Sequence, residues 1–460
     1  MKYNRFSSFR ETTQYLPAEI EGQVPAWLDG YFISTGPGKF HVGDTQFKHW
    51  FDGFALLKSF HFHEGKVSAL ARYVGSRQYT ESERRQTLYT NEFGTVAPGL
   101  MGSVRDLLYS SGYDNANVNV YALDGGDVVA VTETPNHCVI DKATLATRGR
   151  KHYQDDIKAN MCLAHPVLDG EKNVLVNIMA TFGRHTQYQV VEHCMTTGAR
   201  KITAVYQSEV PFYMHGFLLT KNYVVLYRTP TETPVRRMLN PMRPIVDAFV
   251  DRPGVGSRLI VIDRRDGRSR EFPVERFFCY HGCNAYEHGD DLVLDLVTTS
   301  SGGYAAFTLD KLNISWETSS DISRYIVSLK DGRVKSEVVY RGSAEFPRIN
   351  ERQFSGKKYQ HVYVADKDEG ATWFNQIREV NVQNGDSRYW SRENTIVGEP
   401  VFIEDGRASD VGDAVLMSLI TDEARARSGL VLISASSFEA LAIIWLSCYF
   451  PPGLHANFFR

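Results

Sequence analysis

Arg258-Leu-Ile-Val-Ile-Asp263, followed closely by the dipeptide Asp266-Gly267, is the stretch of sequence that decides the fold. The run is short and rich in branched aliphatic residues, a composition that favours a β-strand. Asp-Gly supplies the positive φ angles that a tight hairpin needs, so we expect the chain to turn back directly after this strand. A strand followed by a hairpin turn is therefore the predicted building unit of the fold.

The same unit recurs along almost the whole chain. Further β-rich runs are Tyr31-Phe-Ile-Ser34, Asp127-Val-Val-Ala-Val-Thr132, Asn173-Val-Leu-Val-Asn-Ile178, Asn222-Tyr-Val-Val-Leu-Tyr227, Asp291-Leu-Val-Leu-Asp-Leu296, Tyr359-Gln-His-Val-Tyr-Val364 and Gly429-Leu-Val-Leu-Ile-Ser434. Further turn signals are Glu64-Gly65, Asp124-Gly125-Gly126, Asp169-Gly170, Asp331-Gly332 and Asn384-Gly385. These patterns predict an all-β protein in which antiparallel hairpins dominate.

A chain of 460 residues built from hairpins must either stack two sheets repeatedly or arrange four-stranded sheets around an axis. Radial repetition leaves the shortest exposed edges, and at about 40 to 70 residues per blade the length suits about six to eight blades. No linker rich in Pro, Gly or Ser divides the chain. Residues 1–460 are therefore expected to form one β-propeller domain.

Composition argues against several other classes of protein. Hydrophobic residues make up 43% and charged residues 23%, which is ordinary for a globular protein and unlike a disordered or fibrous one. The formal charge of -3 shows no basic excess, so nucleic acid is not an expected partner. The six cysteines form no Cys-x-x-Cys pair and residues 1–20 are polar, which predicts reduced thiols and a cytoplasmic protein. The longest apolar run, at residues 441–446, is too short to span a bilayer.

Four of the 14 histidines share one setting, because each lies among apolar or aromatic residues beside a predicted strand. They are His165, His215, His281 and His455. Such positions suit side chains that come from different blades and point toward one axis. Imidazole binds Zn, Cu, Fe and Ni, so the set predicts a metal site without fixing the metal. The alternative for any one of them alone is a packed or surface histidine.

Three glutamates lie in apolar strand contexts, where an unpaired carboxylate is unfavourable. They are Glu133, Glu345 and Glu399. Metal-bound imidazoles need an acceptor for their second nitrogen, and carboxylates are the best acceptors. From the residues alone, this role is balanced against the alternative that each glutamate ends a strand and faces water.

Short motifs spread over nearly the whole chain carry a resemblance to a known family. They are Gly36-Pro-Gly38, His49-Trp-Phe-Asp-Gly53, Asn91-Glu-Phe-Gly-Thr95, Asn115-Ala-Asn-Val-Asn-Val-Tyr121, Thr132-Glu-Thr134, Ala164-His-Pro166, Asn284-Ala-Tyr-Glu287, Glu345-Phe-Pro347 and Gly453-Leu-His455. Each motif is weak alone, but their order resembles that of the carotenoid cleavage oxygenase family. They are most similar to its animal branch, which contains the β-carotene oxygenases and the retinoid isomerase of the retinal pigment epithelium.

The resemblance implies a seven-bladed β-propeller with a helical and loop cap, which holds one non-haem Fe(2+) per chain on its axis. Carried over residue by residue, it places the iron ligands at His165, His215, His281 and His455 and the outer carboxylates at Glu133, Glu345 and Glu399. His165 is then the ligand without a carboxylate. No catalytic side chain is expected beyond the metal site, because the metal activates O2 and the protein positions the substrate.

The resemblance further implies oxidative cleavage of a conjugated C=C bond of a carotenoid or apocarotenoid to two carbonyl products, with O2 as co-substrate. Stilbenoid-cleaving relatives carry a lysine just before the first outer glutamate, whereas this chain has Thr132, as carotenoid and retinoid members do. The isomerase subgroup carries a Pro-Asp-Pro-Cys motif that the segment Val96-Ala-Pro-Gly-Leu-Met101 lacks. A stilbenoid cleaver, a retinoid isomerase and a non-catalytic binding propeller stay as alternatives.

An apolar polyene needs an apolar tunnel. Phe51, Phe93 and Leu454 match positions that line the cleft in relatives, and Thr132 lies beside the first outer glutamate. For the three apolar side chains, the alternative is plain core packing.

Two cap segments are expected, at approximately 96–112 and 231–256. Their apolar residues are Leu100, Val104, Leu107, Leu108, Val235, Met238, Leu239, Met242, Ile245, Val246 and Phe249, and their basic ones are Arg236, Arg237 and Arg243. This mixture predicts peripheral contact with a membrane surface, where carotenoids dissolve. The alternative is a cap helix packed on the propeller.

Overall fold

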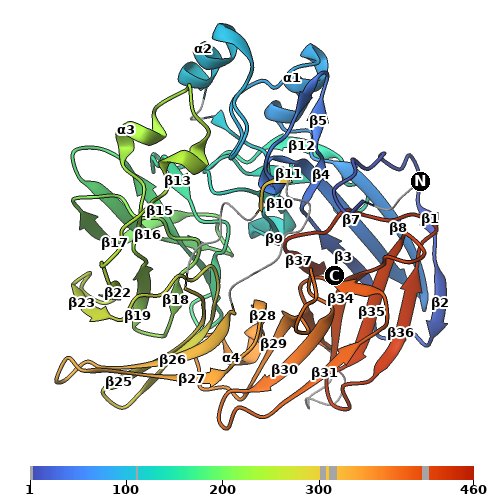
Figure 1. Cartoon of the computed structure of the whole chain (residues 1–460). Coiled ribbons are helices and arrows are strands. Elements are labelled where there is room, and N and C mark those ends of the chain that lie inside the picture. Colours follow the sequence, from blue (N-terminus) through green and yellow to red (C-terminus); the bar gives the residue numbers. More distant parts are fainter. Residues whose placement is uncertain (1–3, 110–111, 301–306, 310–318, 407–413) are drawn as a thin grey trace.

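The computed structural model describes residues 4–109, 112–300, 307–309, 319–406 and 414–460. Within these residues, seven antiparallel sheets surround one axis as the blades of a propeller (Figure 1). The prediction of a seven-bladed propeller is thereby confirmed. Two ribbons lie outside the blades, one of β5 (His41–Val42) and β6 (Thr45–Gln46) and one of β20 (Thr231–Glu232) and β21 (Val250–Asp251).

The blades are numbered along the chain, and the strands of each are given from the axis outward. Blade 1 contains β37 (Ala456–Phe459), β3 (Gly30–Ser34), β7 (Phe54–His63), β8 (Lys66–Tyr73) and β1 (Leu16–Pro17), with β4 (Pro37–Lys39) paired to β7. Blade 2 contains β9 (Asn119–Ala122), β10 (Val128–Val131), β11 (Cys138–Ile140) and β12 (Thr147–Arg150). Blade 3 contains β13 (Met161–Cys162) and β14 (Val167–Asp169), both paired to β15 (Val174–Thr181), then β16 (Thr186–Cys194) and β17 (Arg200–Ser208).

The second half of the ring is more regular. Blade 4 contains β18 (Leu218–Leu219), β19 (Tyr223–Arg228), β22 (Ser257–Asp263) and β23 (Ser269–Val274). Blade 5 contains β24 (Gly282–His288), β25 (Asp291–Thr298), β26 (Asp321–Ser328) and β27 (Val334–Tyr340). Blade 6 contains β28 (Glu345–Arg348), β29 (His361–Asp366), β30 (Gln376–Asn381) and β31 (Ser387–Ser391). Blade 7 contains β33 (Val401–Glu404) and β32 (Thr395–Val397), both paired to β34 (Ala414–Asp422), then β35 (Arg427–Ser434), β36 (Ala440–Trp445) and β2 (Glu19–Gly22).

The stretch Arg258–Asp263, with Asp266-Gly267 after it, forms the hairpin that its residues predict. β22 and β23 pair in an antiparallel register that runs from Ser257↔Val274 to Ile262↔Ser269. The turn between them contains Gly267, whose φ of +76° lies in the left-handed region that favours glycine. The Asp-Gly signal therefore set the turn for the reason expected. The other predicted β-rich runs overlap β3, β10, β15, β19, β25, β29 and β35, with differences of one or two residues at some ends.

Both ends of the chain close the ring. β2, from the N-terminal region, is the outermost strand of blade 7 and pairs with β36. β37, at the C-terminus, is the innermost strand of blade 1 and pairs with β3. The first and last blades thus each contain strands from both ends of the chain, which joins the two ends by backbone hydrogen bonds (Figure 1).

The hydrophobic core is distributed between the blades. In the described part of the chain, each pair of neighbouring blades encloses one cluster of buried apolar side chains. Phe60 of β7 and Leu432 of β35, both fully buried, belong to the cluster between blades 1 and 7. Complete burial of such a side chain contributes about 1.5–3 kcal/mol, so the ring is held by seven separate cores rather than one.

Helices gather at one side of the propeller (Figure 1). They are α1 (Arg77–Arg85), α2 (Gly99–Tyr109) and α3 (Val235–Met238), followed by the 3-10 turn η4 (Ile245–Ala248). The two predicted cap segments touch, because Ser103 Oγ of α2 lies 3.3 Å from Met242 Sδ. The second segment also contacts the residues before the first, since the Val246 N–H donates to the Phe93 carbonyl at 2.9 Å. Shorter helices occur within loops, namely η1 (Trp50–Asp52), η3 (Asp124–Gly126) and α4 (Glu351–Phe354).

The sequence does not predict α1. Its residues are mostly polar, so no apolar periodicity marks it. Its first turn is capped by Ser76, which accepts from the Tyr79 N–H, and by Asp114, whose two carboxylate oxygens each accept a backbone N–H at 3.0 Å. Asp114 is distant in sequence, so the tertiary fold stabilises this helix.

None of the helices in the described residues is long and apolar enough to cross a membrane. All six cysteines are free thiols.

Candidate metal centre

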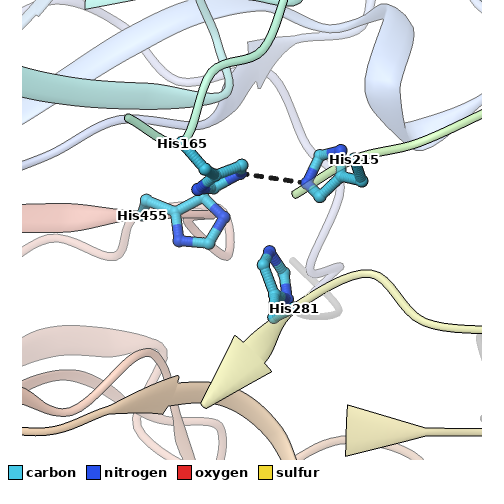
Figure 2. Close-up of side chains that lie close together, drawn as sticks. All are labelled: His165, His215, His281 and His455. Carbon is cyan, nitrogen blue, oxygen red and sulfur yellow. Dashed lines mark hydrogen bonds between the residues drawn. The ribbon is translucent and has the colours of Figure 1, made fainter. Parts of the chain in front are cut away.

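The four candidate histidines meet on the propeller axis. Their ligand nitrogens all lie within 4.8 Å of one another, and the Nε2 atoms of His165 and His215 are 3.0 Å apart (Figure 2). Figure 2 shows the four rings converging on one small volume from separate segments of the chain. His281 and His455 directly precede the innermost strands β24 and β37, His165 lies between β13 and β14, and His215 precedes β18. Four different blades therefore supply one imidazole each.

Two of these histidines are followed by a glycine that close packing requires. A Cβ atom added to Gly216 would lie 2.5 Å from the Tyr227 hydroxyl oxygen, and one added to Gly282 would lie 2.4 Å from Leu218 Cδ2. Both distances are below any normal contact, so a side chain at either position would have to push the Tyr227 or Leu218 side chain aside. The His-Gly pairs of the sequence thus mark places where the segment that carries the histidine packs tightly against a neighbouring side chain.

Each of the other three blades supplies one of the candidate glutamates. Glu133 follows β10 of blade 2, Glu345 begins β28 of blade 6, and Glu399 precedes β33 of blade 7. Their carboxylates accept hydrogen bonds from the Nδ1 atoms of His215 at 2.6 Å, His281 at 2.6 Å and His455 at 3.0 Å, respectively. No carboxylate contacts His165 in the described residues. Every blade thus contributes one histidine or one glutamate to the centre.

The carboxylates are fixed further by backbone groups. Glu345 also accepts the Phe346 N–H at 2.6 Å, and Glu399 accepts the Ala456 N–H at 2.7 Å. Phe346 has a φ of +53°, which is unusual for a residue with a side chain and strained. Its ring centroid lies 5.7 Å from that of His281 and 5.3 Å from that of His455. The strained backbone thus places one aromatic ring against two of the imidazoles.

Electrostatics favour the ionised form of two of the carboxylates and the neutral form of two of the imidazoles. Burial opposes ionisation of Glu399, yet Arg348 and His455 lower its pKa to about 2. Burial likewise opposes ionisation of Glu345, but His281 and the Phe346 N–H hold its pKa below the usual value. Burial lowers the pKa of His455 to about 4 and that of His165 well below its usual value, the latter aided by the neighbouring histidines. Neutral imidazole is the form that binds a metal ion.

The residues fit a divalent cation. The buried Nε2 atom of His281 has no hydrogen-bond partner among the described residues, although buried polar atoms almost always have one. Its Nδ1 atom is held by Glu345, which leaves Nε2 directed at the other three rings. Imidazoles whose outer nitrogens donate to carboxylates form a typical metal-binding arrangement.

The aromatic residues expected in a tunnel form a chain of rings that leads to the centre. Phe51 and Phe93 have centroids 5.7 Å apart, Phe93 lies 5.4 Å from Phe249, and Phe249 lies 4.7 Å from Tyr213. The Tyr213 hydroxyl lies 3.1 Å from His215 Nδ1. Aromatic rings therefore connect the cap to one of the imidazoles.

The remaining residues expected in a tunnel are Leu454 and Thr132. Leu454 is partly buried against the cluster that also contacts Phe51, and Thr132 is buried directly before Glu133. The Glu133 side chain is 25% exposed, whereas those of Glu345 and Glu399 are 4% and 3% exposed. The Glu133 side of the centre is thus the more open one.

Sequence reasoning missed three residues around the centre. Tyr213 contacts His215, Arg348 contacts Glu399, and Lys58 donates to the Pro451 carbonyl at 3.1 Å beneath the segment that carries His455. Tyr213 lies two residues before His215 and Arg348 three residues after Glu345, so adjacency in the sequence was an available signal. No local pattern distinguishes Lys58 from an exposed strand lysine.

Comparisons with known proteins agree with this geometry. The fold and the site define a seven-bladed propeller with a four-histidine centre on its axis. The sequence model of the family described as retinal pigment epithelial membrane protein matches residues 6–460. The chain therefore belongs to that family, the carotenoid oxygenase family, as its motifs predicted.

Individual relatives cover nearly the whole chain. The β,β-carotene 15,15'-dioxygenase of Gallus gallus is 26% identical over 520 residues, which cover 97% of this chain and 96% of that protein. The carotenoid isomerooxygenase of Galleria mellonella is 26% identical, with 94% of this chain and 91% of that protein covered. Among solved structures, the cobalt-substituted apocarotenoid oxygenase of Synechocystis superposes with a TM-score of 0.88 at 21% identity, covering 99% of this chain and 97% of that one. The structural likeness shows that the fold is shared.

Lys58 provides a test of this part of the structure. Its side chain is fully buried, and burial lowers its pKa to about 7. The unfolded lysine has a pKa of about 10.4, so between these values the unfolded chain binds a proton that the folded chain does not. Stability from this group therefore rises with pH across that window.

We expect Lys58→Met to be more stable than the wild type below pH 7 and to lack part of this rise. The difference in unfolding free energy between variant and wild type should shrink as pH increases from 7 toward 10, measured by urea denaturation. Lys66→Met, at an exposed lysine of β8, is the matched control and should show no such trend. Parallel pH curves for Lys58→Met and the wild type would contradict the assignment.

Proposed function

We propose that this protein is a non-haem Fe(2+) dioxygenase that cleaves a conjugated C=C bond of a carotenoid or apocarotenoid to two carbonyl products with O2. The observation that carries the proposal is the convergence of four imidazoles, three of them held by carboxylates, in a chain of the carotenoid oxygenase family. Relatives named as dioxygenases and a structural neighbour described as cobalt-substituted support a metal-dependent reaction of this class.

Two groups of residues have different roles at the centre. His165, His215, His281 and His455 would hold the metal, and Glu133, Glu345 and Glu399 orient three of the rings. When bound, Fe(2+) supplies activation of O2 for attack on an alkene. The protein itself needs no nucleophile or general acid, so its contribution is to orient an apolar substrate and to exclude water.

Substrate class follows from the open side of the centre. The rings of Phe51, Phe93 and Phe249 contact one another at steep angles and offer an apolar aromatic lining that suits a conjugated polyene. Thr132 lies beside Glu133 in place of the lysine that would pair with a phenolate, so a stilbenoid is disfavoured. Isomerase-like activity is the second candidate, because one relative is named an isomerooxygenase.

Replacing a ligand should remove the metal. We expect His281→Ala to lose at least tenfold in metal affinity, since one of four donors is deleted and Glu345 loses its partner. Metal analysis after purification in Fe(2+) measures the loss. His288→Ala, at the exposed far end of β24, the strand that follows His281, is the control and should retain the metal. A His281→Ala protein with full iron content would refute the centre.

Substrate class is tested by product chromatography. Incubation of the iron-loaded protein with β-carotene, an apocarotenal and resveratrol should give carbonyl products only from the first two, because an apolar wall and Thr132 provide no partner for a phenolate. Product masses identify the cleaved bond and reveal any isomerised product. Consumption of resveratrol alone would assign the protein to the stilbenoid class.

We further propose that the cap touches a membrane surface. Large apolar side chains on α2 and around α3 are exposed, namely Leu100, Met101, Val104, Leu108, Leu239, Met242 and Ile245. The side chain of Leu107 lies outside the described residues. Arg236, Arg237 and Arg243 are exposed beside them, and apolar groups flanked by cations suit an interface with anionic lipid. The exposure of α2 argues against a helix whose apolar residues are all packed on the propeller.

Vesicle sedimentation measures this contact. We expect Leu100→Asp to reduce binding to vesicles with anionic lipid several-fold, because a charge replaces a side chain that is 78% exposed on the patch. Leu168→Asp, at a 41% exposed leucine of β14 in blade 3, is the matched control and should bind as the wild type does. Equal vesicle binding by Leu100→Asp and Leu168→Asp would contradict the proposal that the cap contacts a membrane.

A further inference from the structure

Arg348 connects the metal centre to the charged surface behind it. It ends β28, and its side chain is only 14% exposed. Its Nη1 atom lies 3.4 Å from Glu399 Oε1, the same oxygen that accepts the His455 Nδ1–H. Its Nη2 atom donates to Asn457 Oδ1 at 2.9 Å, and its Nε atom lies 3.2 Å from Glu351 Oε1. One guanidinium therefore contacts the carboxylate that holds His455 and the strand that follows His455.

The three glutamates of the centre differ in whether an arginine contacts them. In the described part of the chain, Glu399 has an arginine within ion-pair distance, while Glu133 and Glu345 form ion-pair contacts with their histidines alone. Glu133 is approached instead by the neutral Tyr213 hydroxyl at 3.4 Å. The second contact of Glu345 is the Phe346 N–H. Arg348 thus gives the centre one fixed positive charge on one side.

The charges of the centre can be counted. Three carboxylates carry three negative charges, the four imidazoles are neutral ligands, and Arg348 adds one positive charge that no accessible pH removes. The Glu351 carboxylate, which also contacts Arg348, is 57% exposed, so solvent screens its charge. The buried groups therefore present two net negative charges to the metal. This number balances a divalent ion and falls one short of a trivalent one.

We propose that Arg348 is a positioning residue that sets the charge of the centre for a divalent metal and thereby favours ferrous over ferric iron. The inference rests on the proposed function, because it concerns iron held by the four histidines. Its physical basis is Coulombic, since a nearby fixed cation raises the energy of the more highly charged metal state. Without the guanidinium, the surroundings would carry three net negative charges and balance the ferric ion.

A cavity makes Arg348 more than a packing residue. A space of about 520 Å³ is lined by Arg348, Glu351, Arg352, Glu404, Asn457 and Arg460. The same space is also lined by Ile349, Val401, Phe402, Ile403 and Phe458, and the guanidinium lies between it and the buried carboxylate. Glutamine at position 348 would remove the charge and keep much of the side-chain length, so Arg348→Gln tests the charge.

The test is a redox titration of the iron-loaded protein, in which one electron from a chemical reductant, carried by mediators, converts ferric to ferrous iron. Arg348→Gln should lower the midpoint potential, with about a tenfold smaller ferrous-to-ferric ratio at a fixed potential. Arg348→Lys keeps the charge and should stay near the wild type. In the double variant Arg348→Gln with Glu399→Gln, the net charge returns to two negative charges, so the midpoint should return toward the wild-type value.

Arg324→Gln is the control for the loss of a buried arginine. Arg324, in the third strand of blade 5, forms a two-point ion pair with Asp295, with both contacts at 2.8 Å. This variant should lose stability and leave the midpoint unchanged. Iron content and melting temperature are measured for every variant, so that a change in potential is separated from a loss of metal or of folding.

The outcomes separate the two proposals. A wild-type protein without iron would refute the proposed function. An iron-containing Arg348→Gln protein with the wild-type midpoint, or an equal shift in Arg324→Gln, would overturn the inference alone. If Arg348→Gln does not fold, Arg348→Lys is compared with the double variant: equal midpoints support the charge balance, and a tenfold difference in the ferrous-to-ferric ratio overturns it.

Discussion

The hydrogen bond between a buried carboxylate and the outer nitrogen of an imidazole is the interaction on which the centre depends. It occurs between Glu133 and His215, Glu345 and His281, and Glu399 and His455. In each pair the two residues come from different blades, so the bond forms only when those blades are assembled, and the Glu399–His455 pair joins the last blade to the first. The propeller brings the three pairs together on its axis, and each carboxylate keeps its imidazole turned toward the same point.

Ring closure and the centre are linked through the last residues of the chain. His455 directly precedes β37, which completes blade 1 by pairing with β3. The Ala456 N–H donates to Glu399 of blade 7, so one short segment joins the first blade, the last blade and the centre. Lys58 contacts Pro451 shortly before this segment and Arg348 contacts Asn457 within it, so two basic side chains hold the chain around His455. The more exposed part of the centre is at Glu133, near Tyr213, whose ring contacts Phe249 of the cap.

Local patterns predicted the strands because their causes are local. Branched and aromatic runs favour extended backbone, and Asp-Gly at Gly267 supplies the left-handed turn. Prolines 241 and 244 limited the second cap segment to the short α3 and η4, as their fixed φ and missing N–H require. The helix α1 escaped prediction because Asp114, which caps it, is distant in the sequence. The blade number came from family motifs, since strand density allowed a range.

The sequence by itself determined that the chain is all-β and which histidines and glutamates sit in apolar settings, because both follow from side-chain chemistry within a few residues. Only the tertiary structure decided which glutamate holds which histidine, since the partners are separated by 82, 64 and 56 residues. It also decided that Lys58 is buried and that Arg348 faces Glu399. A strand residue's surroundings depend on the neighbouring blade, and no local pattern records which residues of that blade lie opposite.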